Sequence, residues 1–384
     1  MSRSPPLNVL FIVRSLGFGG AERQLTELAK GLHRRGHRIA VVVYYGGGAL
    51  ARELTAAGVE VLALGKRNRW DLIGPFGVLT REVRRRQPEI LHGYLPDGNL
   101  LALLARRAWP SARVVWGVRA SNLEAGHYDW LGATVFRASC TLARRADLAI
   151  ANSEAGRHYH VGRGFPEDRI VVIPNGIDLG RFRPDPEAGA RQRSAWGIPE
   201  TAPVIGIVGR LDPMKDHETF LSAAARFGSR VPEAWFVSIG AGETSYVAHL
   251  HRLAASFGLE RRLRWVPPQE DVTAVYNGLD LLTSSSAFAE GFSNVVGEAM
   301  ACGVRCVVTD VGDSALVVGD TGIVVPPRDP GALCQAWERG LELRGPDPRT
   351  RIEWEFSVER LIERTERALL GLRSAHGAVE SRSA

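Results

Sequence analysis

The stretch at residues 287–303 reads Ala-Phe-Ala-Glu-Gly-Phe-Ser-Asn-Val-Val-Gly-Glu-Ala-Met-Ala-Cys-Gly. A Gly-Phe-Ser turn follows Glu290, and Ser293 is a suitable N-cap for a helix that carries Glu298 in its second turn and ends at Gly303. The unpaired N–H groups at the start of such a helix attract phosphate. The carboxylates cannot bind phosphate, but they can accept hydrogen bonds from hydroxyl groups. The stretch therefore predicts a site for a ligand that combines phosphate with sugar and ribose hydroxyls.

Three further motifs follow a fixed order along the chain. They are Gly-Phe-Gly-Gly-Ala-Glu-Arg at 17–23, Ile-Pro-Asn-Gly-Ile-Asp at 173–178 and Gly-Arg-Leu-Asp-Pro-Met-Lys-Asp-His at 209–217. Together with the two glutamates, they make the chain similar to the retaining GT-B glycosyltransferases of family 4. Two glutamates at this spacing alone would carry no weight, whereas four ordered motifs do. The resemblance implies two Rossmann-like domains that face each other across a cleft, and a C-terminal helix that crosses back to the first domain.

The length and composition agree with two globular domains. A chain of 384 residues exceeds one ordinary core, and 45% hydrophobic with 23% charged residues is typical of a folded protein. No run of eighteen apolar residues occurs, and Leu7 to Val13 predicts an opening strand and not a signal peptide, so we expect a cytoplasmic protein. The cysteines lack zinc-type spacing and are expected to be small buried residues. They are Cys140, Cys302, Cys306 and Cys334.

Short apolar runs alternate with helical stretches throughout the chain. This alternation favours parallel sheets covered by helices on both faces, with functional residues at the carboxyl ends of the strands. The expected strands are 7–13, 39–44, 59–64, 89–92, 113–118, 147–151 and 170–174 in the first half, and 203–208, 235–239, 263–266, 279–284, 304–309 and 322–325 in the second. The expected domains are an acceptor-side domain at 1–180 joined by a C-terminal helix at about 356–384, a linker at 181–202, and a nucleotide-sugar-binding domain at 203–355.

Positive charge is concentrated in the first half of the chain. Residues 1–190 hold 27 Lys and Arg against 17 Asp and Glu, while the rest holds 21 against 25. Basic runs at 66–70 and 84–86 flank apolar residues that predict an amphipathic helix. Two interpretations remain open, an ordinary surface helix with a solvated basic face or a contact with an anionic membrane. Nucleic acid is not expected as a partner because no binding motif accompanies the basic residues.

The second domain supplies the expected catalytic residues, which are Glu290, Arg210 and Lys215. Arg210 and Lys215 bracket a turn after a strand, so both cations can face the diphosphate whose charge grows as the glycosidic bond breaks. The resemblance assigns them to this diphosphate, and the alternative is surface pairing with Asp212 or Asp216.

The resemblance further implies that Glu290 holds donor-sugar hydroxyls and Glu298 the ribose. Neither a metal nor another cofactor is expected, because Asp310 and Asp313 are better explained as turn residues. The remaining expected donor contacts are Gly19, Phe292, Ser293, Asn294 and Val295.

The glycine-rich loop after the first strand resembles a dinucleotide-binding turn, but Glu22 stands where its third glycine would be. This counts against a dehydrogenase. The resemblance places the loop near the donor phosphates or the acceptor, and the alternative is a simple strand-to-helix turn. Many family members carry a histidine where this chain has Arg119, which cannot act as a base. Arg119 is expected to hold an anionic group or to pair with Glu124. The acceptor-side candidates are Gly17, Gly20, His92, Arg119 and Asn122.

The resemblance implies transfer of a glycosyl group from a nucleotide sugar to an acceptor hydroxyl, with retention of the anomeric configuration. The expected acceptor is lipid-linked or a polysaccharide, in polysaccharide, lipopolysaccharide or glycolipid biosynthesis, at the inner face of the membrane. A GT-B nucleotide-sugar epimerase and a non-catalytic nucleotide-sugar or lipid-binding module remain alternatives. Whether a protein carboxylate attacks the sugar covalently stays open.

Overall fold

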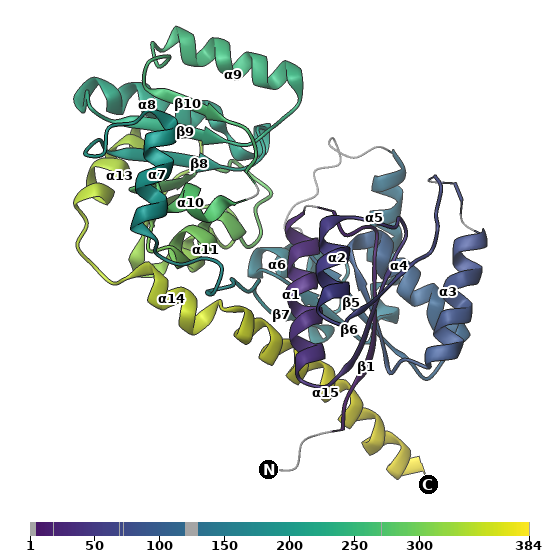
Figure 1. Ribbon diagram of the computed structural model, residues 1–384. Coiled ribbons are helices and arrows are strands. Elements are labelled where there is room, and N and C mark those ends of the chain that lie inside the picture. The colour runs from purple at the N-terminus through teal and green to yellow at the C-terminus, as the bar shows by residue number, and fades with distance from the viewer. Residues whose placement is uncertain are drawn as a thin grey trace. The chain divides into compact units, whose positions relative to one another are not determined.

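The computed structural model describes residues 5–17, 19–68, 70–71, 73–119, 130–269 and 271–383, with only the backbone described at 130–131 and 374–383. It divides the chain into unit 1, Met1–Gly176 with Val358–Ala384, and unit 2, Ile177–Ser357. Each unit contains one parallel sheet with helices on both faces (Figure 1). The predicted class of two Rossmann-like domains is therefore confirmed.

The sheet of unit 1 has the strand order β3-β2-β1-β4-β5-β6-β7, and all its neighbouring strands are parallel. The chain starts at the middle of the sheet, extends to one edge and then crosses to the other, as in a doubly wound fold. The strands are β1 (Asn8–Val13), β2 (Arg38–Val43), β3 (Glu60–Ala63), β4 (Ile90–Tyr94), β5 (Arg113–Val118), β6 (Leu148–Ala151) and β7 (Ile170–Val172).

Helices cover the two faces of this sheet because successive strand residues point to opposite sides. In β1, Phe11 and Val13 belong to the core on one face, and Leu10 and Ile12 belong to the core on the other. The first face is covered by α1 (Gly20–Arg34), α2 (Ala49–Ala56) and α15 (Val358–Ser383), and the second by α3 (Ile73–Arg86), α4 (Leu95–Ala105), α5 (Trp130–Leu142) and α6 (Glu154–Val161).

The C-terminal helix α15 belongs to unit 1, as predicted. It packs against α1 so closely that a Cβ atom at Gly31 would lie 2.0 Å from Cδ1 of Ile362. A hydrogen bond of 2.7 Å joins His37 to Glu366 on the same helix. The last part of the chain thus completes the core of the first domain.

The sheet of unit 2 is again parallel, with the order β10-β9-β8-β11-β12-β13. Its strands are β8 (Val204–Val208), β9 (Trp235–Ile239), β10 (Leu263–Val266), β11 (Leu281–Ser284), β12 (Arg305–Thr309) and β13 (Ile323–Val325). One face is covered by α7 (Pro186–Trp196), α10 (Val272–Asn277), α11 (Asn294–Ala301), α12 (Ser314–Val318) and α14 (Pro348–Glu355), and the other by α8 (His217–Arg230), α9 (Thr244–Ser256) and α13 (Pro330–Glu342). The segment 181–202, expected as a linker, contains α7, which packs on α10 within unit 2.

Candidate active site

The carboxylate of Glu290 is the buried centre of the candidate site in unit 2. It lies 2.5 Å from Nζ of Lys215 and accepts a hydrogen bond from the Ser286 hydroxyl at 2.7 Å. Glu290 is only 8% exposed. The preceding residue, Ala289, has a φ of +60°, a conformation that non-glycine residues adopt rarely and that costs about 1 kcal/mol or more. The surrounding structure therefore holds this carboxylate in a defined place.

Two loops are joined to bring Lys215 to Glu290. The Ala287 N–H donates to the Met214 carbonyl at 2.8 Å, and the Ser285 hydroxyl donates to the Lys215 carbonyl, also at 2.8 Å. These bonds link the 3₁₀ turn Pro213–Lys215 to the segment that follows β11. The lysine and the glutamate, which are far apart in sequence, are thus fixed by backbone contacts as well as by their own ion pair.

Opposing influences act on the pKa of Glu290. Burial alone would raise it, but the charge and hydrogen bond of Lys215, the hydrogen bond from Ser286 and the charge of Arg210 act in the opposite direction. The net result is a pKa of the Glu290 carboxyl below its ordinary value. Glu290 is therefore an anion at neutral pH and accepts hydrogen bonds only.

The two predicted cations differ in their surroundings. The Arg210 side chain is 74% exposed and pairs with Asp212 at 3.1 Å, which is the surface pairing considered as an alternative. Lys215 pairs with Glu290 and not with Asp216, whose carboxylate caps α8 through the Thr219 N–H. A lysine ammonium has three N–H donors, and among the described residues only Glu290 accepts from it. Two donors therefore remain for an anionic ligand.

Helix α11 starts at the predicted place. Ser293 occupies the N-cap position, but its hydroxyl does not cap the helix. Glu298, in the second turn, accepts a hydrogen bond from the hydroxyl of Tyr276 on α10 at 2.6 Å. Burial and the neighbouring Glu298 charge raise the pKa of Tyr276 well above its ordinary value, so it donates this bond as a neutral phenol. The phenol thus orients the carboxylate expected to bind ribose.

Phe292 lies differently from the neighbouring candidates. It is 5% exposed, and its ring packs edge-on against Phe356 with the centroids 5.4 Å apart. Its side chain therefore belongs to the core, and only its backbone is available to a ligand. Asn294 and Val295 open α11 and are partly exposed.

Two residues of this site were not predicted from the sequence. Ser286, which binds Glu290, ends the run Thr-Ser-Ser-Ser at 283–286, so a polar run directly after a strand was the available signal. Tyr276, which binds Glu298, had no such signal. Its position depends on the packing of α10 against α11, which local sequence does not show.

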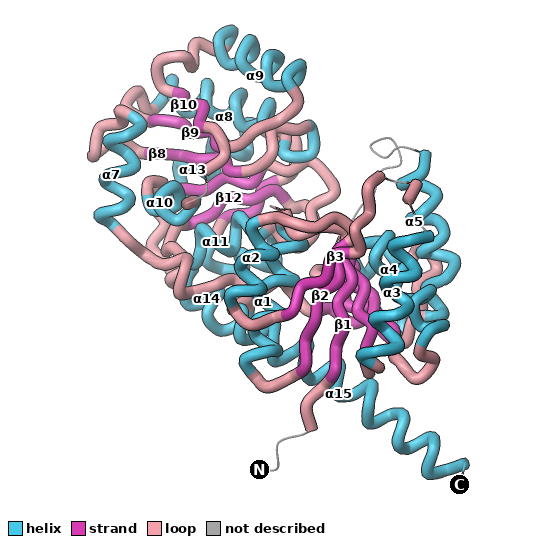
Figure 2. Tube along the Cα trace, turned by 45° about the vertical axis from the view of Figure 1, so that its right-hand side comes forward, coloured by secondary structure: helices cyan, strands magenta, loops and turns pink. Residues whose placement is uncertain are grey.

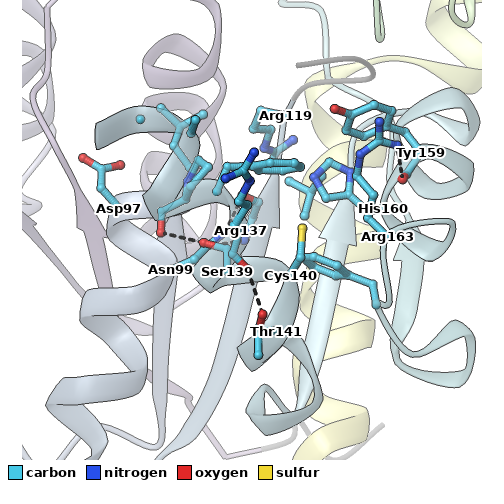
Figure 3. A pocket seen from close by; sticks show the side chains of 18 of the residues that line it. Asp97, Asn99, Arg119, Arg137, Ser139, Cys140, Thr141, Tyr159, His160 and Arg163 are labelled. Carbon is cyan, nitrogen blue, oxygen red and sulfur yellow. Dashed lines mark hydrogen bonds between the residues drawn. The ribbon is translucent and has the colours of Figure 1, made fainter. Parts of the chain in front are cut away.

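Unit 1 contains a cavity of about 930 Å³ at the carboxyl ends of β4 and β5, between α4, α5 and α6. Figure 3 shows Asp97 on one side, Tyr159 and Arg163 on the other, and Arg119 and Arg137 between them. Apolar and aromatic side chains such as Phe136 form part of the wall. Among the described lining residues four are arginines, the fourth being Arg14, and Asp97 is the one acid. This cavity favours an anionic ligand.

Arg119 is held at the end of β5. Its Nη atoms donate to the Tyr94 hydroxyl at 2.7 Å and to Asn175 Oδ1 at 3.1 Å, and its guanidinium stacks 4.7 Å from the centroid of the Tyr94 ring. No carboxylate among the described residues forms an ion pair with it, and its buried Nε has no hydrogen-bond partner there. A half-buried guanidinium without a carboxylate is suited to an anion from solution.

His92 does not line this cavity. It is fully buried, with its ring 5.0 Å from those of both Phe11 and Tyr94, and both ring nitrogens lack partners among the described residues. Burial, and then the charge of Arg119, lower the pKa of His92 to about 3. It is therefore a neutral core residue behind Tyr94.

The glycine-rich loop leads into α1. Gly19 is the N-cap, and a Cβ atom there would lie 2.1 Å from Oε2 of Glu22, so a side chain would displace that carboxylate. A Cβ atom at Gly17 would meet no atom within 4 Å, and Gly20 is the first residue of α1. Asn122 lies outside the described residues, as does Glu124.

Three further properties concern the described part of the chain. It contains no group of three or more His, Cys, Asp or Glu side chains placed to hold a metal. None of its helices combines the length and the apolar character needed to cross a bilayer. All four cysteines are free thiols, of which Cys140 is half-buried at the cavity and the others are buried.

Comparison with known proteins gives the same assignment for both units. The family model for glycosyltransferase family 4 matches residues 18–181, and the model for glycosyl transferases group 1 matches 202–342. The D-inositol 3-phosphate glycosyltransferase of Salinispora arenicola is 30% identical over 325 residues, 75% of this chain and 71% of that protein. The enzyme of the same name from Rhodococcus jostii is 29% identical over 339 residues, 79% of this chain and 72% of that protein.

Solved structures share the fold. Anabaena HepE in complex with UDP-glucose superposes with a TM-score of 0.82 at 22% identity, covering 95% of this chain and 100% of that one. A glycosyltransferase from Rickettsia africae gives a TM-score of 0.81 at 19% identity, covering 96% and 99%. With both units matched and a relative aligned over most of its length, the chain belongs to glycosyltransferase family 4, a retaining family with the GT-B fold that uses nucleotide-sugar donors.

Proposed function

We propose that this protein transfers a hexosyl group from a nucleoside diphosphate sugar to a hydroxyl group of an anionic acceptor, with retention of the anomeric configuration. The donor binds to unit 2 around Lys215, Glu290 and Glu298, and the acceptor binds in the arginine-lined cavity of unit 1. The observation that carries the proposal is the buried Lys215–Glu290 pair. Its carboxylate is ionised, and two N–H groups of its ammonium remain to bind a ligand.

Each donor contact follows from the chemistry of its side chain. Lys215 and the more exposed Arg210 bind the diphosphate, together with the N–H groups at the start of α11. The anionic Glu290 repels phosphate and accepts hydrogen bonds from the sugar hydroxyls. Glu298, oriented by Tyr276, accepts hydrogen bonds from the ribose. A nucleotide sugar suits this site because its phosphates meet cationic side chains and its hydroxyls donate hydrogen bonds to carboxylates.

The reaction breaks the bond between the anomeric carbon and the phosphate oxygen. The leaving nucleoside diphosphate takes the electron pair, and Lys215 and Arg210 stabilise the developing negative charge. The acceptor hydroxyl attacks from the same face of the sugar and passes its proton to the departing phosphate oxygen. This route needs no nucleophile from the protein.

The acceptor is proposed to carry a negatively charged group such as a phosphate. The four arginines of the cavity, with Arg119 lacking a carboxylate partner among the described residues, favour such a ligand. The names of the relatives, D-inositol 3-phosphate glycosyltransferases, point to the same acceptor chemistry. A lipid-linked or polysaccharide acceptor in cytoplasmic polysaccharide, lipopolysaccharide or glycolipid biosynthesis also fits when it carries phosphate.

An assay of donor turnover tests this proposal. UDP-glucose, UDP-N-acetylglucosamine, GDP-mannose and ADP-glucose would each be incubated with the protein, with and without D-inositol 3-phosphate, and followed by NMR. We expect one donor to be consumed only with a phosphorylated acceptor, with the anomeric configuration retained, and turnover to be lost in Lys215→Ala but kept in Arg252→Ala. Arg252 is an exposed residue on α9 of the same unit. Conversion of the donor to an isomeric nucleotide sugar without acceptor would instead establish an epimerase.

A further inference from the structure

Helix α3 of unit 1 carries an unusual outer surface. Its inner residues Leu79 and Val83 are fully buried, as expected for an amphipathic helix. Its first turn is different, because Ile73 is 91% exposed and Phe76 is 37% exposed. Trp70, just before the helix, is 64% exposed. Single exposed apolar residues are ordinary, but three large ones within seven positions form a patch.

Cations continue this patch along the same face of the helix. Arg81 and Arg84 lie eight and eleven positions after Ile73, spacings that place them on its side of an α-helix, and both are exposed. Neither forms an ion pair with a described residue. Arg67, in the loop before Trp70, is exposed as well.

The acidic residues near this face are engaged in local contacts. Glu82, the only acid on α3, is buried and binds Arg85 and Arg86, and Arg86 also pairs with Glu60. The basic run at 84–86 is therefore largely neutralised apart from Arg84. Asp71 accepts the Arg67 backbone N–H at 3.1 Å and so helps to shape the preceding turn.

We propose that this face docks on the surface of an anionic lipid bilayer. The proposal goes beyond glycosyl transfer and does not depend on it. The apolar side chains at the start of α3 enter the boundary between headgroups and acyl chains, and the arginines farther along the helix contact lipid phosphates. Tryptophan favours that boundary because its ring is apolar and its N–H is polar. The residues of this α3 surface are Arg67, Trp70, Ile73, Phe76, Arg81 and Arg84.

Charge and apolar character together favour a bilayer over other occupants. A second copy of this chain would bring the same arginines against each other, and like charges repel. Nucleic acid would satisfy the arginines but leave Ile73 in contact with phosphate and water. An anionic bilayer offers phosphate at the surface and hydrocarbon directly beneath it. Figure 2 shows α3 beside α4, with which it is in contact, so α4 covers the buried side of α3 and leaves the side that carries Ile73 exposed.

Vesicle flotation with the full chain tests this proposal. The vesicles would contain either phosphatidylcholine alone or phosphatidylcholine with 30% phosphatidylglycerol, and no acceptor or nucleotide. We expect the protein to float with the anionic vesicles, to float much less with the neutral ones, and to be released by 0.5 M NaCl. Failure to float with anionic vesicles, or equal flotation with both kinds, would overturn the proposal.

Two pairs of variants separate the apolar contribution from the charge contribution. Arg81→Gln with Arg84→Gln should weaken binding about fivefold per arginine at low salt. Trp70→Ser with Ile73→Ser should weaken it by at least tenfold even at low salt. The matched controls lie on unit 2 and replace exposed residues of the same kinds, Arg252→Gln with Arg261→Gln and Phe257→Ser with Leu316→Ser. Equal losses in the controls would contradict the assignment to α3.

A depth measurement locates the contact directly. Brominated lipids quench tryptophan fluorescence only near the acyl chains, so the wild type should be quenched and Trp70→Phe should lose most of that quenching while still floating. Quenching that stays the same in Trp70→Phe would place another surface on the bilayer. These vesicles contain neither donor nor acceptor, so a failed docking test leaves the transferase proposal intact. In the same way, a failed transferase assay leaves the docking proposal intact.

Discussion

Replacing Lys215 by methionine should destabilise unit 2 by leaving Glu290 buried without its counter-ion. Methionine has an unbranched apolar side chain one atom shorter than that of lysine, and it removes the charge together with the N–H donors. Breaking one side of a buried ion pair costs about 3–5 kcal/mol, and we expect the lower end because the Ser286 hydrogen bond to Glu290 remains. For a unit of this size, about 3 kcal/mol lowers Tm by about 6–12 °C.

The pH dependence of this loss has a definite sign. In the folded wild type the pKa of Glu290 lies below its ordinary value. The Lys215–Glu290 pair therefore stabilises the fold at pH values above the ordinary pKa, and this stabilisation is lost as the pH falls through the folded-state pKa. Without Lys215, burial dominates and raises the pKa of Glu290 above its ordinary value. The variant then regains stability as the carboxyl is protonated on acidification. The difference in Tm should be largest near pH 8 and smallest below about pH 4.5.

Scanning calorimetry of the full chain measures this difference. The double variant Lys215→Met with Glu290→Gln should recover most of the lost stability, because both charges are then gone. Arg252→Met, an exposed change in the same unit, should stay within about 0.5 kcal/mol of the wild type. If Lys215→Met unfolds at the wild-type temperature at pH 8, the pair is not the buried, mutually stabilised unit described above.

Three further predictions concern single side chains. Tyr276→Phe removes the hydroxyl that orients Glu298 and should weaken nucleoside diphosphate binding about tenfold in calorimetric titrations; unchanged affinity would show that Glu298 needs no such support. Arg119→Met should lower stability by about 1–3 kcal/mol, because the buried Tyr94 hydroxyl loses its donor, and should raise KM for a phosphorylated acceptor at least tenfold with the affinity for the nucleotide sugar unchanged, whereas a weakened affinity for the nucleotide sugar would place Arg119 at the diphosphate. The pKa of His92 is about 3 in the folded protein, so between about pH 3 and pH 6.5 this residue is protonated only in the unfolded chain, and stability falls as the pH drops through that range. His92→Phe should therefore remove one proton from the proton uptake on unfolding near pH 5, which is measured from the slope of the unfolding free energy against pH. An unchanged slope would contradict the burial of a neutral His92.

The fold could be predicted largely from the sequence because its signals are local. Apolar runs such as those of β1 and β8 mark strands buried on both faces, and the glycine-rich turn before α1 marks a strand-to-helix transition. The C-terminal helix was predicted through the family resemblance, since nothing local indicates that α15 packs on α1. Close packing at Gly31 is visible only once both helices are placed.

The site was harder to predict because its bonds connect distant residues. Lys215 and Glu290 were each proposed for the donor, but their direct pairing depends on two loops of unit 2 meeting. Tyr276 reaches Glu298 only through helix packing. The apolar residues between the two basic runs predicted an amphipathic helix, and α3 buries Leu79 and Val83 while Ile73 and Phe76 are exposed, a difference that the sequence pattern alone did not indicate. Hydrophobic periodicity predicts which face of a helix is apolar, but it does not predict how far along that face the neighbouring elements pack.

Calorimetric titration of the nucleoside diphosphates UDP, GDP and ADP tests the central claim most directly, that unit 2 binds a nucleotide sugar through Lys215 and Glu298. The account predicts that one of the three binds to the wild type and to the exposed control Glu233→Ala with equal affinity. It predicts at least a tenfold loss in both Lys215→Ala and Glu298→Ala. Binding of none of the three, or equal binding in all four proteins, would contradict it.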